Sequence, residues 1–180
     1  MNDKQLAALI MSQVLPAMQA HPDLADVGLL RNYQPTQQGA YTTPKVYFFK
    51  VTDRRYGHPK RRETWNTLAG RFDHAEVQAY ESTYQFSAQV PQDPAATTAL
   101  TESDVLNVVS GIIQSDTILS TFQAAGVGIL RVTDVRNPYI VDEYTRYEAI
   151  PTFDVVFTHE RVIAATLPAV VAYEAQIVRV

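Results

Sequence analysis

The alternation of side chains over residues 75–90 constrains the fold of this chain more than any other segment. If this stretch is a strand, one face carries Tyr80, Tyr84, Phe86, Ala88 and Val90. The other face is mostly polar and carries Val77, Ala79, Glu81, Thr83, Gln85, Ser87 and Gln89. Period-two alternation is typical of a strand that packs one face on a core and leaves the other to water. The segment therefore predicts a long strand in a sheet that is covered on one face.

Helices are predicted on either side of this group of strands. Apolar residues at helical spacing predict a helix over residues 3–20, which Asn2 or Asp3 can cap. The capping box Thr101-Glu102-Ser103-Asp104 predicts a second helix over 102–114, with Val105, Val108, Val109 and Ile112 facing inward. A third helix is expected over 115–125. It ends at Gly126, where a helix stop favours positive φ.

Further strands are expected at 26–34, 44–54, 61–66, 127–135, 150–160 and 169–179. Because the strands come in runs and do not alternate with helices, antiparallel pairing is favoured. The predicted fold class is α+β: a mostly antiparallel sheet flanked by an N-terminal helix and a central helix pair. A chain of 180 residues fits a single domain over residues 1–180.

Composition excludes several classes of site. The chain has no cysteine, which rules out disulfides, thiol catalysis and cysteine-based zinc sites. No apolar run approaches the roughly 18 residues of a membrane span, and no signal segment opens the sequence. We therefore expect a protein that is made and used without membrane insertion.

Charge is distributed unevenly. The segment 54–62 reads RRYGHPKRR and holds five basic residues, Arg54, Arg55, Lys60, Arg61 and Arg62, with no acid. The rest of the chain has ten basic and nineteen acidic residues. Because the segment contains Gly57 and Pro59 between two predicted strands, it is predicted to be a basic hairpin tip (54–62).

Three interpretations of the basic segment remain open. It is a solvated loop, a contact for nucleic-acid phosphates, or a contact for an acidic protein surface. The acidic body of the chain argues against a dedicated nucleic-acid-binding module. A head-to-tail contact satisfies both signs, with the segment of one subunit meeting acids such as Asp134, Asp142, Glu143 or Glu148 of the next.

No catalytic, cofactor or metal site is expected. The Gly126-Val127-Gly128 motif follows a helix and precedes a strand, the reverse of the order that dinucleotide binding requires. The four histidines lie in four separate segments, and the chain has neither a GxSxG elbow nor a phosphate-binding P-loop. A second interface candidate is the polar stretch that holds Tyr139, Tyr144 and Tyr147, because tyrosine is favoured at protein interfaces. The alternative is an ordinary ordered loop.

The segment from Arg136-Asn137-Pro138 to Phe153-Asp154-Val155-Val156-Phe157 resembles the phage neck terminator proteins, which are related in role to tail terminator and tail completion proteins. The layout of residues 102–135 is also similar, so the resemblance covers about 80 residues. It implies a non-enzymatic virion protein of the neck or tail, made in the host cytoplasm. It also implies a homo-oligomeric ring, most simply a hexamer, stacked on tail-tube, connector or sheath proteins. Genome DNA would pass through the lumen without specific binding.

Two other classes stay open from the residues. One is a different virion adaptor, such as a connector or baseplate component. The other is a small α+β enzyme whose pocket is built from scattered Tyr, His and Asp side chains. In the ring interpretation, the polar face formed by Glu81, Thr83, Gln85, Ser87 and Gln89 lines the lumen, where uncharged groups let DNA slide.

Overall fold

The computed structural model describes residues 1–31, 43–91, 98–141 and 147–164. Its helices are α1 (Asp3–Gln19), the short 3₁₀ helix η1 (Pro22–Leu24), α2 (Glu102–Ile113) and α3 (Asp116–Ala124). Its strands are β1 (Gly28–Arg31), β2 (Lys45–Asn66), β3 (Arg71–Gln89), β4 (Val127–Val132), β5 (Tyr139–Val141), β6 (Tyr147–Ala149) and β7 (Thr152–Ala164). The strand expected at 169–179 lies outside the described residues.

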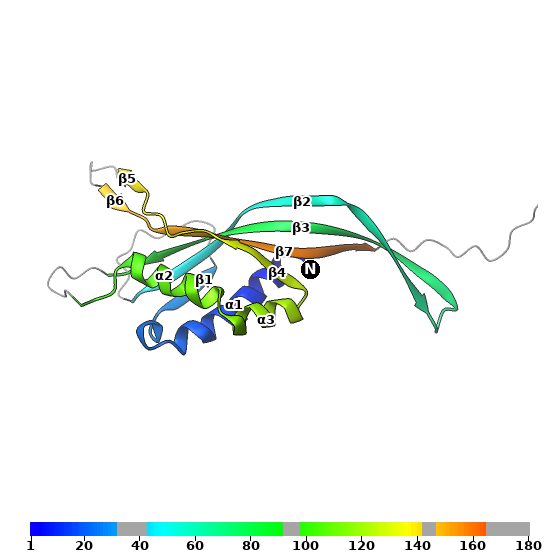
Figure 1. Cartoon of the computed structure of the whole chain (residues 1–180), viewed down its shortest axis with the longest axis horizontal. Coiled ribbons are helices and arrows are strands. Elements are labelled where there is room, and N and C mark those ends of the chain that lie inside the picture. The colour runs from blue at the N-terminus through cyan, green and yellow to red at the C-terminus, as the bar shows by residue number, and fades with distance from the viewer. Residues whose placement is uncertain (32–42, 92–97, 142–146, 165–180) are drawn as a thin grey trace, which may run out of the picture.

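Five strands form one mixed sheet in the order β1-β2-β3-β7-β4, and β5 pairs with β6 in a separate two-stranded sheet. Only β1 and β2 run parallel, while the other neighbours in the large sheet are antiparallel. The three α-helices lie together on one side of the large sheet (Figure 1). The predicted α+β fold class is therefore confirmed, whereas the single-domain expectation for residues 1–180 stays a prediction.

The core lies between the helices and the near face of the sheet. Register aligns the aromatic side chains of three strands, because Phe48 on β2 lies opposite Phe86 on β3, and Phe86 lies opposite Phe153 on β7. The Phe86 and Phe153 rings stack with centroids 5.0 Å apart. Phe157 on β7 stacks on Phe122 of α3 at 5.4 Å, which ties the sheet to the helices. The alternation over 75–90 thus correctly predicted that Tyr84, Phe86 and Ala88 are buried, whereas Tyr80 and Val90 are half-buried and Val77, assigned to the polar face, is buried.

Local signals fix the ends of the helices. The Asn2 side chain accepts a hydrogen bond from the Gln5 amide at the start of α1, and Thr101 accepts one from Asp104 at the start of α2. Gly126 has a φ of 73° directly after α3, as expected for a helix stop.

Among the described residues no single helix is long and apolar enough to cross a membrane. Helices α2 and α3 taken together, with a bend of 55° between them, meet the length and composition required.

The predicted inward face of α2 needs a small correction. Its buried residues are Val105, Leu106, Val109 and Ile113, whereas Val108 and Ile112 are only partly buried. Helix α2 packs against β3 and β7 and also against α1 and α3. Because it has neighbours on more than one side, its apolar stripe is wider than, and rotated from, the one predicted by spacing alone.

The prediction of a hairpin tip at residues 54–62 is wrong. Strand β2 continues through this segment to Asn66, and the hairpin turns at residues 67–70, where Gly70 has a φ of 58°. Gly57 (φ of 67°) and Pro59 are accommodated by a bulge, because the pairing register shifts between Tyr56 and Lys60. The predicted strand at 61–66 is therefore the continuation of β2, and its partner is the start of β3.

Candidate interaction surfaces on the arm and the sheet

The β2–β3 hairpin extends well past the helices. We call residues 60–77 the arm: the end of β2, the turn and the start of β3. Strand β7 pairs with β3 only as far as Ala75, so the last four pairs of the arm have no third strand in the described structure. Figure 1 shows the arm projecting beyond the helices and bending toward the side of the sheet on which they lie.

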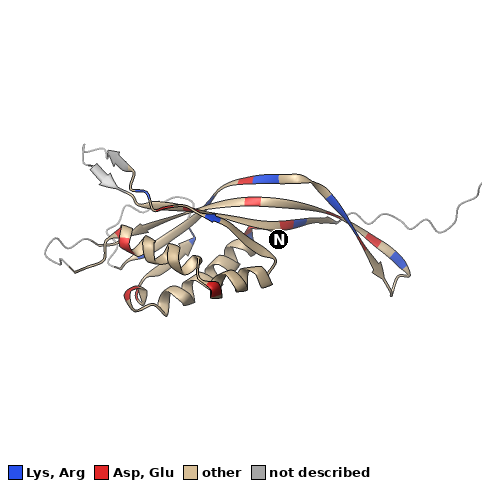
Figure 2. Cartoon of the chain, viewed as in Figure 1, with Lys and Arg blue, Asp and Glu red and all other residues tan. Residues whose placement is uncertain are grey.

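The basic segment lies on a free edge of the sheet. Strand β1 pairs with β2 only from Lys45 to Phe48, so among the described residues no strand covers the outer edge of β2 beyond that point. All five basic side chains of the segment are exposed, and Figure 2 shows Lys and Arg distributed along β2 and the arm. Basic side chains, a proline and a bulge are features by which proteins protect free sheet edges from pairing with other chains.

The five cations differ in their partners. Arg62 forms an ion pair with Glu160 on β7 at 3.0 Å, and Arg61 forms one with Glu63 at 3.3 Å. Arg54 and Arg55 make no ion pair with any described residue. Lys60 makes none either, so Arg54, Arg55 and Lys60 are the members of the segment whose charge is most available to a partner.

Apolar residues gather at the end of the arm, where the sequence analysis named none. Trp65 and Phe72 lie opposite each other across the strands, with ring centroids 5.0 Å apart, and are 52% and 50% exposed. Leu68, in the turn, is fully exposed. Once the hairpin turn is placed at residues 67–70, the sequence predicts this pair, because Trp65 precedes the turn and Phe72 follows it by the same number of residues.

The face of the large sheet that points away from the helices is mainly polar. Glu81, Thr83, Gln85 and Ser87 on β3 are half-buried there, with Thr158 and Asp154 of β7 as neighbours. The Gln85 amide donates a hydrogen bond to Asp154 at 3.2 Å, and Arg136 forms an ion pair with the same carboxylate. The predicted polar face is thus present, and the charge of Asp154 on it is balanced by Arg136.

A buried polar network connects three strands below the arm. The Ser82 hydroxyl is 2.5 Å from Asp53 Oδ1 and 2.9 Å from His159 Nε2. Because a carboxylate only accepts, Ser82 donates to Asp53 and accepts from His159 Nε2–H. His159 Nδ1 is then an unprotonated acceptor, and it has no partner among the described residues. Lys50 completes the network by binding both Asp53 and Asp3.

This network does not form a catalytic triad. In a triad the histidine accepts the proton of the serine, whereas here the Ser82 proton is held by Asp53. Ser82 is also completely buried, so no substrate reaches its hydroxyl. Among the described residues no three His, Cys, Asp or Glu side chains are grouped so that they hold a metal ion.

A protein-family model described as the E217 gateway protein gp29 matches residues 5–169 of the chain. The chain belongs to this gateway protein family. No curated protein matches the chain at a significant level.

Membership in the gateway protein family supports a structural role at the head–tail junction of a tailed phage, and therefore a place in the virion. It points to a non-enzymatic protein. The expected resemblance to phage proteins of this junction is confirmed at that level, and the finer assignment as a terminator remains a proposal. The match extends far beyond the 80 residues that carried the resemblance, since it includes α1 and the whole β2–β3 hairpin.

The second predicted interface of this gateway-family chain is only partly described. Tyr139 is the first residue of β5 and Tyr147 is the first residue of β6, and these two strands pair with each other. Asp142, Glu143 and Tyr144 lie outside the described residues. The structure therefore shows only that β5 and β6 pair with each other, and the role of the tyrosine-rich segment as an interface stays a prediction.

Ionisation within the buried network sets an expected pH dependence. Burial lowers the pKa of His159 below its ordinary value of 6.5. Burial also pulls the pKa of Lys50 down, but hydrogen bonds from its ammonium to Asp3 and Asp53 outweigh this effect and leave the pKa raised. The hydrogen bond from Lys50 in turn lowers the pKa of Asp3. At neutral pH the network therefore holds a neutral His159 beside a charged Lys50 and a charged Asp3.

We expect the free energy of unfolding to decrease as the pH falls below about 6.5. The unfolded chain binds a proton at His159 at a higher pH than the folded chain does, so acid favours unfolding until the pH passes the folded pKa. His159→Gln keeps a donor for Ser82 and removes the titration, so the decrease between pH 7.5 and 5 should become smaller. Urea unfolding of both proteins across this range measures the effect. An unchanged pH slope in the variant contradicts the assignment.

Proposed function

We propose that this chain forms a homo-oligomeric ring, a hexamer, that acts as a terminator in the neck of a tailed phage. The observation that carries the proposal is the match of residues 5–169 to the gateway protein family. The structure supports it with a subunit that has a compact helical layer and a charged arm projecting from one end (Figure 2). When one surface of a subunit binds a different surface of the next copy, the copies form a closed ring if the rotation between neighbouring copies permits.

Within this ring the basic segment contacts the acidic surface of a neighbour. Arg54 and Arg55 supply the charge, since Arg61 and Arg62 already pair with Glu63 and Glu160 of their own subunit. Asp134, which is exposed after β4, and the acids of the tyrosine-rich segment are the proposed partners. Tyr139, Tyr144 and Tyr147 add amphipathic area to the same contact.

The polar sheet face lines the lumen through which genome DNA passes. Its acid Glu81 repels phosphates, and the cation Arg136 is neutralised by Asp154. A surface with few unopposed Lys and Arg releases few counterions from DNA and therefore binds it weakly. Tail-tube, connector or sheath proteins are the proposed partners above and below the ring.

Deletion of the gene from the phage genome, followed by complementation with the chain in trans, tests the function. We expect the deletion to yield unjoined heads and tails under the electron microscope, and complementation to restore joined particles that contain the chain by mass spectrometry. Purified virions that lack the chain, or normal joining after the deletion, would falsify the proposal. The symmetry of the neck in reconstructed particles gives the number of copies and tests the hexamer.

The same complementation tests the basic contact. Replacing Arg54 and Arg55 by serine should reduce joining, and the defect should grow with ionic strength because exposed charge contacts are screened by salt. The matched control removes two exposed cations outside the basic segment, with Lys4→Ser and Arg131→Ser. Equal joining by the two double variants contradicts the contact without affecting the role at the junction.

A further inference from the structure

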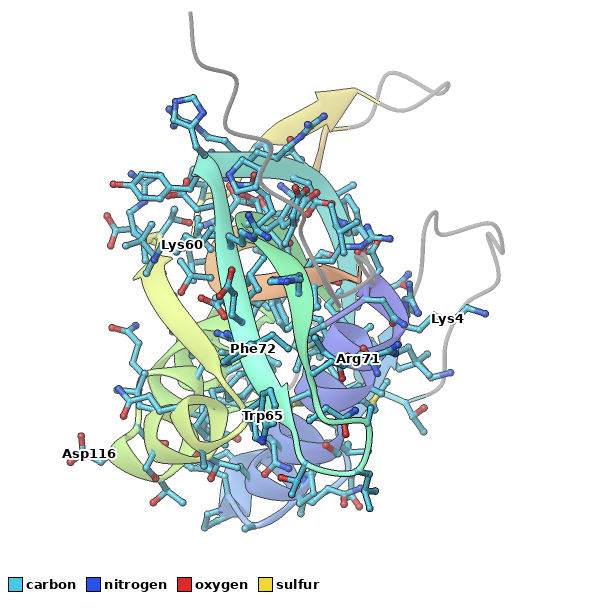
Figure 3. The ribbon with its side chains drawn as sticks, turned by 90° about the vertical axis from the view of Figure 1, so that its right-hand side faces the viewer. Lys4, Lys60, Trp65, Arg71, Phe72 and Asp116 are labelled. Carbon is cyan, nitrogen blue, oxygen red and sulfur yellow. The ribbon has the colours of Figure 1, made fainter. Side chains whose placement is uncertain are left out.

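The end of the arm exposes an apolar cluster that the described part of its own subunit leaves uncovered. Trp65 and Phe72 are each about half exposed despite packing on each other, and Leu68 is fully exposed. We call these three residues the arm tip. Figure 3 looks toward the arm and labels Trp65 and Phe72 on its two strands, with Arg71 beside them. Aromatic and arginine side chains are the residue types that carry most of the binding energy in protein interfaces.

The arm tip is also poorly supported as an isolated element. Its four outermost pairs, from Glu63–His74 to Asn66–Arg71, have no third strand among the residues that the structure describes. Two-stranded hairpins are marginally stable in water unless a further strand or a helix covers them. A hairpin that ends in exposed aromatics is therefore stabilised by a surface that packs on it.

The helical layer offers a surface of opposite charge. The arm carries four basic residues, Lys60, Arg61, Arg62 and Arg71, and three acids, Glu63, Asp73 and Glu76, whereas residues 101–126 hold three acids, Glu102, Asp104 and Asp116, and no Lys or Arg. Arg61, Arg62 and Arg71 each pair with an acid of their own subunit, and Lys60 makes no ion pair with a described residue. Figure 1 shows that the arm bends toward the side of the sheet on which the helices lie. When copies are placed next to one another by rotation, the arm of one and the helices of the next lie on the same side of the assembly.

We propose that the arm tip of one copy docks on the α2–α3 layer of a second copy. Trp65, Leu68 and Phe72 supply the apolar centre, and the flanking basic residues meet Asp104 and Asp116. The proposal rests on the proposed ring, because the ring brings the two copies together. It adds an apolar contact to the charge contact of Arg54 and Arg55, and it names a different acceptor surface.

Photocrosslinking in the particle tests this contact. Benzoylphenylalanine replaces Leu68, whose side chain is fully exposed, and the chain complements the deletion phage as a mixture of ¹⁴N- and ¹⁵N-labelled copies. We expect irradiation to join position 68 to residues 101–126 of a differently labelled copy. Three results overturn the docking and leave the proposed function intact. They are a crosslink to another virion protein, a crosslink to a different part of the chain, and the absence of any crosslink in particles that contain the chain. Particles without the chain overturn both.

Substitution gives an independent measurement. Trp65→Ser with Phe72→Ser should lower the yield of joined particles by about tenfold or more, as expected when interface anchors are lost. Leu130→Ser is the control, because Leu130 is 60% exposed on β4, away from the arm. If the double variant lowers the melting temperature of the purified chain, Leu68→Asp in the turn replaces it. Normal joining by a folded arm-tip variant overturns the proposal.

Discussion

Replacing Phe157 by alanine should lower the free energy of unfolding by about 3–5 kcal/mol. Phe157 is completely buried, stacks on Phe122 of α3 and meets the edge of Tyr84 at 5.8 Å. Its removal opens a cavity at the contact between sheet and helices, where neither side can close the space without moving a whole element. Urea unfolding of the purified chain, with the slope compared between variants, measures the loss.

The matched control is the same substitution at Phe72, which is 50% exposed on the arm. Phe72→Ala should change the unfolding free energy of the unassembled chain by no more than about 1 kcal/mol. A loss below roughly 1 kcal/mol for Phe157→Ala would contradict the core described here, since that value is typical of surface positions. The pair of variants thus separates aromatic residues that build the subunit from those that we assign to assembly.

Ser82→Ala should cost about 1–3 kcal/mol, because it leaves buried polar atoms without partners. The Ser82 hydroxyl joins Asp53 to His159 through hydrogen bonds to these two side chains on neighbouring strands. Without the hydroxyl, neither ring nitrogen of His159 forms a hydrogen bond with a described residue, although the side chain is almost completely buried, at 6% exposed. Thermal and urea unfolding at pH 7.5 measure the cost.

Ser87→Ala on the same strand provides the comparison, because Ser87 is half-buried on the opposite, polar face. This variant should remain within about 0.5 kcal/mol of the parent, as is usual for surface substitutions. Equal effects at the two serines would show that the network contributes no more than an ordinary surface position.

Elements with local signals were predictable from the sequence. The capping residues Asn2 and Thr101 act within one helical turn, and Gly126 ends α3 through its own backbone conformation. The alternation over β3 likewise follows from a single strand in contact with one core. Each of these features depends on residues that are neighbours in the chain, so the pattern contains the needed information.

The path of β2 was not predictable in the same way. Gly57 and Pro59 favour a turn, yet the bulge between Tyr56 and Lys60 keeps the strand paired with β3. Whether such a segment turns or bulges is decided by the partner strand, which offers continuous pairing as far as Arg71. The buried network was hidden for the same reason, because strand register brings Asp53, Ser82 and His159 together from three separate segments.

The bulged edge of β2 has a consequence for the timing of assembly. A smooth free edge lets any exposed strand add to it through backbone hydrogen bonds, so freshly made copies would aggregate at random. Here the register shift, Pro59 and the flanking cations block such addition along much of the exposed edge. We therefore expect newly synthesised copies to accumulate as separate molecules. They then assemble through side-chain contacts between complementary surfaces, and not through backbone hydrogen bonds at the strand edge.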